Sequence, residues 1–328
     1  MIIYNLRWHI LIVMDLVPSS PSSPSNAPSP SAGPPGYCGT FINLDRSPDR
    51  RRDMETQLHT FEIADRYGRF SAIDGDALSN YRGPLRRGEV GCFLSHFRAL
   101  ERMRMAGTHV HIMEDDVLLS RQLAPMIDFT ISQGVFQYFD VIFTDVYVGF
   151  ENISNIRFHK QMYDAFLANS QSDFFRAFRV LSLDGQVFYS MSSYVVAAHA
   201  IDRVLAFYKK EIEAGPVTPV DILICRLALE RKLRVGYLFP FVTSLRLERA
   251  LDTTILGRGT DSSAMATHGS NLIRYSFFIE RDLPGYASPL LAQSIAKCVS
   301  RPRDEHQDFI TRAMEYIGMI DDPIASPT

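Results

Sequence analysis

The stretch His111-Ile112-Met113-Glu114-Asp115-Asp116-Val117 joins a short apolar segment to three consecutive acidic residues. Residues 110–113 are typical of a short strand, so the acids are expected where that strand ends. Three adjacent carboxylates repel one another, and a divalent cation offsets that cost. Oxygen ligands suit Mg²⁺ or Mn²⁺. A solvated acidic turn is the commoner explanation of an isolated acidic triplet, so the surrounding sequence has to decide between the two.

Strands and helices are predicted to alternate on both sides of the triplet. Apolar runs predict strands at 40–44, 69–73, 110–113, 138–144, 187–198 and 235–239. Helical spacing predicts helices that start near Ser47-Pro48 and that span 92–105, 201–214 and 222–230. The alternation indicates an α/β fold with a mostly parallel central sheet flanked by helices. Residues 152–179 are expected to form a long loop with helical pieces.

Polar residues follow several of the predicted strands. They are Asp45-Arg46, Asp74-Gly75, the acidic triplet and Asp145. Ligands of parallel α/β sheets bind beyond the carboxyl ends of the strands. We therefore expect these side chains to converge, and this convergence favours the metal site over the solvated turn.

Composition excludes some classes of function. The chain has 328 residues, 46% of them hydrophobic, and a formal net charge of -3, which gives no support to nucleic-acid binding. Its four cysteines are far apart and form no CxxC pair, so neither a zinc cluster nor a disulfide scaffold is expected. A reducing compartment fits this cysteine usage best.

The two ends of the chain differ from its centre. Residues 1–17 are apolar but short for a membrane span and interrupted by charge, and residues 18–36 are rich in Ser and Pro. We expect a disordered lead at 1–36, a catalytic domain at 37–260 and an extension at 261–328. The expected location is the cytoplasm, with peripheral association with the inner membrane as a further option.

Several motifs occur in a specific order. They are FINLDRSPDR at 41–50, AIDG at 72–75, GEVGCFLSH at 88–96, EDDV at 114–117, PVD at 219–221 and, faintly, TTI at 253–255. In this order they resemble glycosyltransferase family 25. That family includes bacterial lipooligosaccharide galactosyltransferases and the collagen galactosyltransferases of animals. The resemblance covers roughly residues 40–258.

The resemblance implies a GT-A type of nucleotide-diphosphosugar fold. It also implies inverting transfer of a hexose, most often galactose from UDP-galactose, to a glycan or a lipooligosaccharide-type acceptor. The implied cofactor is Mn²⁺ or Mg²⁺, which would neutralise the leaving diphosphate. Glu114 and Asp116 have the spacing of the metal-binding acids, with Asp115 between them, although the sequence does not tell which two of the three are ligands.

Seven residues are expected to bind the donor, with different alternatives for each. They are Asn43, Arg46, Arg50, Asp74, Gly75, His96 and Asp115. An arginine fork suits a diphosphate, but arginines at a helix start can also simply face water. The Asp74-Gly75 pair is equally typical of a plain turn. His96 is almost as compatible with a structural histidine.

An inverting transfer needs a general base for the acceptor hydroxyl. Asp221 is the candidate, because it matches the resemblance and is separate from the triplet, although a helix cap explains an Asp there equally well. Glu89 is a second catalytic candidate, for the base or for sugar hydroxyls, and it too could cap a helix. Asp145 is the remaining contender.

Two other functions use the same residues. One is an inactive glycosyltransferase-like module that binds a sugar nucleotide, and the other is a metal-dependent phosphoesterase. The phosphoesterase is disfavoured because the aspartyl-phosphate pattern and the histidine clusters of two-metal enzymes are missing from the sequence. The expected partners are a nucleotide-sugar donor and a saccharide or glycolipid acceptor, with no nucleic acid.

Overall fold

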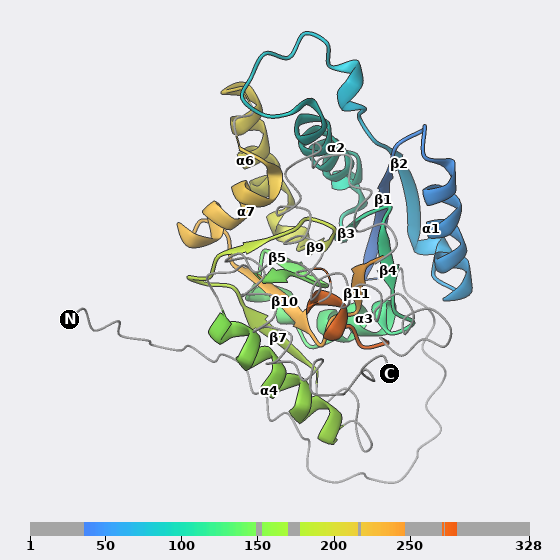
Figure 1. Cartoon of the computed structure of the whole chain (residues 1–328), viewed down its shortest axis with the longest axis vertical. Coiled ribbons are helices and arrows are strands. Elements are labelled where there is room, and N and C mark those ends of the chain that lie inside the picture. Colours follow the sequence, from blue (N-terminus) through green and yellow to red (C-terminus); the bar gives the residue numbers. More distant parts are fainter. Residues whose placement is uncertain are drawn as a thin grey trace, which may run out of the picture.

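The computed structural model describes residues 36–148, 153–169, 178–215, 218–246, 271 and 273–280. Within them the chain forms a seven-stranded sheet in the order β2-β1-β3-β9-β5-β10-β7 (Figure 1). Its strands are β1 (Tyr37–Asn43), β2 (Tyr67–Ser71), β3 (His109–Glu114), β5 (Val141–Phe143), β7 (Arg179–Ser182), β9 (Ser193–Val196) and β10 (Val235–Phe239).

The sheet is mainly parallel with two reversed strands. β1 pairs in parallel with both β2 and β3, and β10 pairs in parallel with β5. β9 lies antiparallel between β3 and β5, and β7 lies antiparallel to β10. The predicted α/β class with a mostly parallel sheet is confirmed, and the arrangement is consistent with a GT-A-like fold. The two reversals were not predicted, because an apolar strand carries no local signal of its direction.

Helices cover both faces of the sheet. They are α1 (Pro48–Thr60), α2 (Arg87–Met103), α3 (Leu123–Ser132), α4 (Ile153–Asn169), α6 (Ile201–Glu213) and α7 (Val220–Leu229). Figure 1 shows α2, α6 and α7 grouped above the sheet and α4 below it. Helix α2 begins five residues before the predicted 92–105, and α4 replaces most of the loop predicted at 152–179.

Short elements connect the larger ones. Two small antiparallel sheets pair β4 (Val117–Leu119) with β11 (Thr243–Leu245) and β6 (Tyr147–Val148) with β8 (Phe188–Tyr189). Turns of 3₁₀ helix lie at Ala64–Arg66, Gly75–Ala77, Arg104–Ala106, Val135–Gln137 and Ala198–Ala200. The predicted strand at 187–198 is thus divided into β8 and β9.

A segment near the C-terminus belongs to the core. Ile273, Tyr275, Phe277 and Phe278 are buried, and the backbone N–H of Phe241 donates to the carbonyl of Phe277. This segment, 271–280, therefore packs on the sheet although it falls within the predicted extension 261–328. The predicted lead, residues 1–36, lies almost wholly outside the described residues, and so does the boundary at 260.

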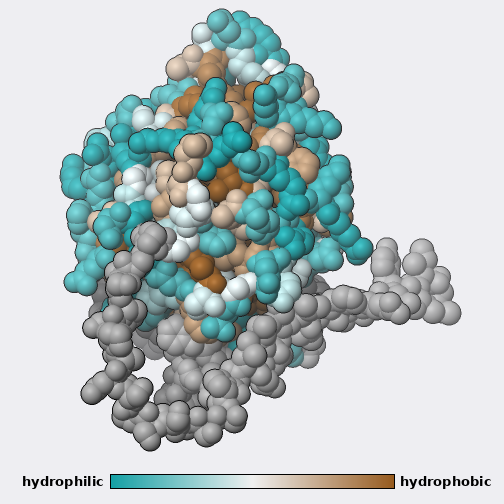
Figure 2. Space-filling model, turned by 180° about the vertical axis from the view of Figure 1, so that it is seen from behind, coloured by the Kyte–Doolittle hydropathy of each residue, from teal (hydrophilic) through white to brown (hydrophobic). Residues whose placement is uncertain are grey.

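None of the helices in the described ranges has the length and apolarity needed to cross a bilayer. On the face shown in Figure 2, hydrophilic residues dominate and apolar residues appear in small separate areas. Scattered apolar side chains are normal on a protein surface, so these areas by themselves do not mark a binding surface.

Candidate functional site

The acidic triplet lies at the carboxyl end of the central strand β3. Glu114 is the last residue of β3, and Asp115 and Asp116 form the turn that leads into β4. Ile42 of β1 is paired with Glu114, so Asn43, at the end of β1, lies beside the triplet. The ends of β1 and β3 therefore lie together, although Asp45 and Arg46, the residues predicted to converge there, pair with Arg69 and Asp74 instead.

Asp115 is held by two residues of the first motif. Asn43 Nδ2 donates to Asp115 Oδ2 over 2.6 Å, and Arg50 Nη1 donates to Asp115 Oδ1 over 3.1 Å. Burial raises the pKa of Asp115, and these two contacts oppose the rise. Both carboxylate oxygens of Asp115 are thus engaged by protein donors.

The side chain of Asp116 differs from that of Asp115 in its contacts. Its Oδ1 is buried and has no hydrogen-bond partner among the described residues, and its Oδ2 lies 3.9 Å from Arg50 Nη1. Burial and the charges of Glu114 and Asp115 raise the pKa of Asp116 to about 7, against the weaker effects of Arg50 and Arg274. An unsatisfied, buried carboxylate oxygen among other acids fits a divalent cation, which would supply the missing partner and charge.

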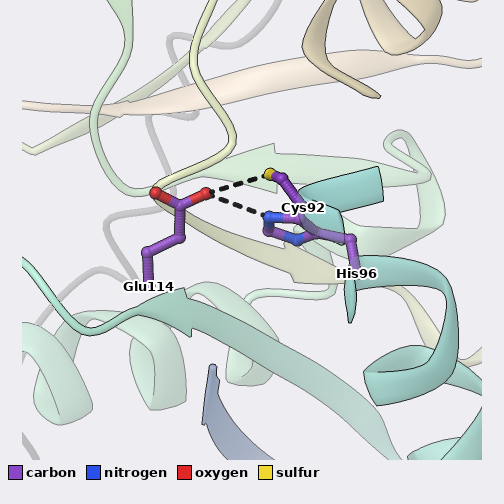
Figure 3. Close-up of side chains that lie close together, drawn as sticks. All are labelled: Cys92, His96 and Glu114. Carbon is purple, nitrogen blue, oxygen red and sulfur yellow. Dashed lines mark hydrogen bonds and ion pairs between the residues drawn. The ribbon is translucent and has the colours of Figure 1, made fainter. Parts of the chain in front are cut away.

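Glu114 faces helix α2 (Figure 3). His96 Nε2 lies 3.1 Å from Glu114 Oε1, and Cys92 Sγ donates to the same oxygen over 3.7 Å. Burial raises the pKa of Glu114, but the hydrogen bond and charge of His96, with help from Cys92 and Arg274, outweigh it and lower the pKa. The pKa values of Glu114 and Asp116 are therefore shifted in opposite directions. Glu114 is favoured as the ionised carboxylate, and Asp116 is the one more easily protonated.

The motif GEVGCFLSH is explained by close packing of α2. A Cβ on Gly91 would lie 2.6 Å from the carbonyl oxygen of Ile73, and one on Gly75 would lie 2.3 Å from the carbonyl oxygen of Arg87. Ser95 Oγ accepts from the N–H of Ile73 over 2.8 Å and donates to the carbonyl of Gly91 over 2.6 Å. These contacts fix α2 against the 73–75 turn and hold Cys92 and His96 toward β3.

Asp221 approaches the same place from another helix. It lies in the first turn of α7, and its Oδ1 accepts from the N–H of Ile222 over 2.9 Å. Burial raises the pKa of Asp221, the N–H groups of Ile222 and Ser190 lower it, and the charge of Glu114 raises it further. The charge of Glu114 therefore acts on the Asp221 carboxylate, although Asp221 belongs to a separate element, α7.

Three predicted residues make their contacts elsewhere. Arg46 pairs with Asp74, and Asp74 also accepts from the N–H of Asp76 over 3.0 Å. Glu89 Oε2 accepts from the N–H of Arg86 over 2.7 Å and so caps α2. In the part of the chain that the structure describes, no contact joins these residues to the triplet, and their roles in donor or acceptor binding stay predictions.

Sequence reasoning missed three residues of the site. Arg274 is only 2% exposed and forms an ion pair with Asp145, the third contender for the base, whose side chain is 0% exposed. Its charge also reaches Glu114 and Asp116. No motif in the sequence pointed to Arg274 or to Tyr194, whose hydroxyl contacts His96. Cys92 did carry one, because a cysteine and a histidine four residues apart on a helix lie on the same face.

Comparison with known proteins identifies a family model and several similar sequences. The family model described as Glycosyltransferase family 25 (LPS biosynthesis protein) matches residues 40–224. Similar proteins include the "Probable inactive glycosyltransferase 25 family member 3" of Bos taurus, 39% identical over 95 residues, which are 23% of this chain and 16% of that protein. Another is a "Glycosyltransferase 25 family member" of Drosophila pseudoobscura pseudoobscura, 36% identical over 96 residues, which are 24% of this chain and 15% of that protein.

The matched part of the chain thus spans about a sixth of the length of these curated relatives. The family model, in contrast, covers more than half of this chain, and within its bounds lie the turn after β1, helix α2, the acidic triplet and Asp221. By these matches the chain belongs to glycosyltransferase family 25.

Proposed function

We propose that this chain is a metal-dependent, inverting hexosyltransferase. The proposed donor is UDP-galactose, and the proposed acceptor is a glycan or a lipooligosaccharide-type glycolipid. The observation that carries the proposal is Asp116 Oδ1, a buried acceptor at the carboxyl end of β3 that has no hydrogen-bond partner within the described ranges. Membership of the family makes sugar transfer the reaction to consider, and we propose the metal and the donor in addition.

Asp116 and Glu114 are the residues that would hold Mn²⁺ or Mg²⁺. When bound, such a cation supplies positive charge to the diphosphate as it leaves. Asp115 is already engaged by Asn43 and Arg50, so it is the least available of the three acids. This distribution of contacts supports Glu114 and Asp116 as the two ligands in the proposal.

The surrounding residues would prepare the site for an anionic donor. Arg50 lies between Asp115 and Asp116 and holds two negative charges at fixed positions. Arg274 contributes a second, buried positive charge that acts on Asp116. Preorganised cations of this kind stabilise charge that develops on a leaving group without further reorganisation.

Asp221 is the proposed general base. It would accept the proton of the acceptor hydroxyl while that oxygen attacks the sugar carbon on the face opposite the diphosphate. Burial moves its pKa upward, toward the range in which a carboxylate takes a proton efficiently near neutral pH. Its position on α7 separates it from the acids proposed to hold the cation.

A second candidate function has a specific observation in its favour. Three of the similar proteins are named inactive or probable inactive members of the family. The alternative is a sugar-nucleotide-binding module that does not catalyse transfer.

A glycolipid acceptor would bring an active enzyme to the cytoplasmic face of the inner membrane, and we include this location in the proposal.

The proposal is tested by measuring the UDP that chelator-treated protein releases from UDP-sugars. The full chain is supplied with Mn²⁺ or Mg²⁺ and with a panel of UDP-sugars, with and without saccharide acceptors. We expect donor-dependent UDP release that needs the cation and that Asp116→Ala abolishes. Asp184→Ala, at an exposed turn after β7, is the control and should retain it.

Each other outcome points to one alternative. Binding of UDP-galactose by calorimetry without UDP release would support the inactive module. Release of phosphate from simple phosphate esters would support the phosphoesterase. Equal UDP release by Asp116→Ala and the unaltered protein would contradict the proposed function of the triplet.

A further inference from the structure

We propose that Cys92, His96 and Glu114 form a binding site for one zinc ion. The ligand atoms of these three side chains all lie within 4.8 Å of one another. Figure 3 shows the thiol and the imidazole approaching the same carboxylate oxygen from α2, while Glu114 comes from the end of β3. The proposal concerns metal binding and stands whether or not the protein transfers a sugar.

Two of the spacings between these atoms are close to those of a tetrahedral zinc site. From the usual zinc bond lengths, a tetrahedron separates a nitrogen from an oxygen ligand by about 3.4 Å and a sulfur from an oxygen ligand by about 3.6 Å. His96 Nε2 lies 3.1 Å from Glu114 Oε1, and Cys92 Sγ lies 3.7 Å from it. A cation could thus enter between the three atoms with small movements of the side chains.

The protein also presents the ligands in a fixed way. Cys92 and His96 lie one turn apart on α2, and Ser95 and Gly91 clamp that turn to Ile73. His96 Nδ1 lies 3.0 Å from the hydroxyl of Tyr194. Metal-binding histidines usually donate their second ring N–H to such a partner, which fixes the ring and leaves Nε2 free to bind the ion.

The ligand set selects the kind of cation. A thiolate and an imidazole suit zinc, whereas Mg²⁺ and Mn²⁺ prefer carboxylates and water. The Cys92 thiol also lies among the negative charges of Glu114, Asp221 and Asp116. A divalent ion balances those charges and allows the thiol to lose its proton to solvent on binding.

The zinc site leaves room for the cation proposed for the sugar donor. Glu114 turns only Oε1 toward Cys92 and His96, and its second oxygen points away from them (Figure 3). Three protein ligands leave a fourth position on zinc for water or another ligand. One carboxylate can therefore serve zinc with one oxygen and the cation at Asp116 with the other.

Metal analysis and cobalt spectroscopy test the site without using activity. The full chain is stripped with a chelator under reducing conditions, loaded with Zn²⁺ or Co²⁺ and dialysed. We expect one zinc ion per chain, and a thiolate-to-cobalt charge-transfer band in the Co²⁺ form. Cys92→Ser should lose the band, and His96→Gln should lose zinc retention.

The matched control is Cys38→Ser. Cys38 is also half-buried, but it donates to the carbonyl of His109 and is not part of this cluster. This variant should keep both the zinc and the band. Tyr194→Phe removes the partner of His96 and should weaken zinc binding by about 10–100-fold.

Two results would overturn the zinc site. One is the absence of the cobalt band in the unaltered protein, which needs no variant to fold. The other is equal zinc retention by Cys92→Ser and the unaltered chain. Zinc binding without UDP release would count against the proposed transfer alone, whereas cation-dependent UDP release without zinc binding would count against the zinc site alone.

Discussion

Arg274 and Asp145 are 129 residues apart in the sequence and form an ion pair in which both side chains are buried. Ser192 Oγ accepts a second hydrogen bond from Arg274 Nη2 over 2.7 Å. The pair ties segment 271–280 to the loop after β5. It also places a positive charge where Glu114 and Asp116 respond to it.

Arg274→Gln should destabilise the fold by about 3–5 kcal/mol, because it leaves the buried carboxylate of Asp145 without its counter-charge. Urea unfolding followed by circular dichroism measures this change. The double variant Arg274→Gln, Asp145→Asn should recover part of the loss, since both charges are then removed. A single variant as stable as the unaltered chain would contradict the buried pair.

Arg121 provides the matched control for that experiment. It also ties segment 271–280 to the rest of the protein, through an ion pair with Glu280 at 2.9 Å, but its side chain is 64% exposed. Exposed pairs contribute little, so Arg121→Gln should change the free energy of unfolding by less than about 1 kcal/mol.

Asp116→Asn should make the metal-free protein more stable at about pH 8. The folded-state pKa of Asp116, about 7, is above its ordinary value of 3.8, so its contribution to stability is fully present below the ordinary value. That contribution is lost as the pH rises through about 7, where the buried carboxylate ionises. Thermal unfolding in the presence of a chelator measures the gain in the variant.

Manganese should reverse the order of the same two proteins. A ligand that binds only the folded state adds about 2.7 kcal/mol at a hundred times its dissociation constant. The unaltered chain should gain this stability and Asp116→Asn should gain much less. If Mn²⁺ stabilises both proteins equally, Asp116 is not a ligand.

Asp221→Asn should lower kcat by about 10²–10⁴-fold and leave donor binding intact. The amide keeps the acceptor oxygen that binds the N–H of Ile222, so the start of α7 is retained while the base is removed. Steady-state UDP release and calorimetric donor binding distinguish the two effects. A parallel loss of donor binding would assign Asp221 to the donor pocket instead.

His111 should make the protein sensitive to acid. Burial lowers the pKa of His111 from 6.5 to about 3, and its two ring nitrogens contact Tyr67 and Ser193. Below pH 6.5 the unfolded chain binds a proton that the folded chain does not. The free energy of unfolding therefore decreases as the pH is lowered from 6.5 to about 3. The expected slope from this group approaches about 1.4 kcal/mol per pH unit.

His111→Gln should remove that part of the slope. Urea unfolding at a series of pH values measures it, and the change of slope, not the stability at one pH, is the readout. His59→Asn on the exposed face of α1 is the control and should leave the slope unaltered. An unchanged slope in His111→Gln would show that the buried ring does not determine it.

Much of the fold and part of the site follow from local sequence. Apolar runs, Ser47-Pro48 and the acidic triplet act over a few residues, so the strands, the start of α1 and the turn after β3 could be predicted. That the end of the first strand lies near the triplet followed less directly, from the rule that ligands bind beyond the carboxyl ends of parallel strands, whereas the contact of Asn43 with Asp115 was not predicted.

The sequence by itself therefore determined the family, the alternation of elements and the place of the acids, since these depend on short-range periodicity and on motif order. Only the tertiary structure decided what each acid contacts: Asn43 and Arg50 for Asp115, His96 and Cys92 for Glu114, and, for Asp116, an Oδ1 without a hydrogen-bond partner among the described residues. It also brought Arg274 to the site from far along the chain. Burial and charge at such contacts arise from distant segments, and no local pattern encodes them.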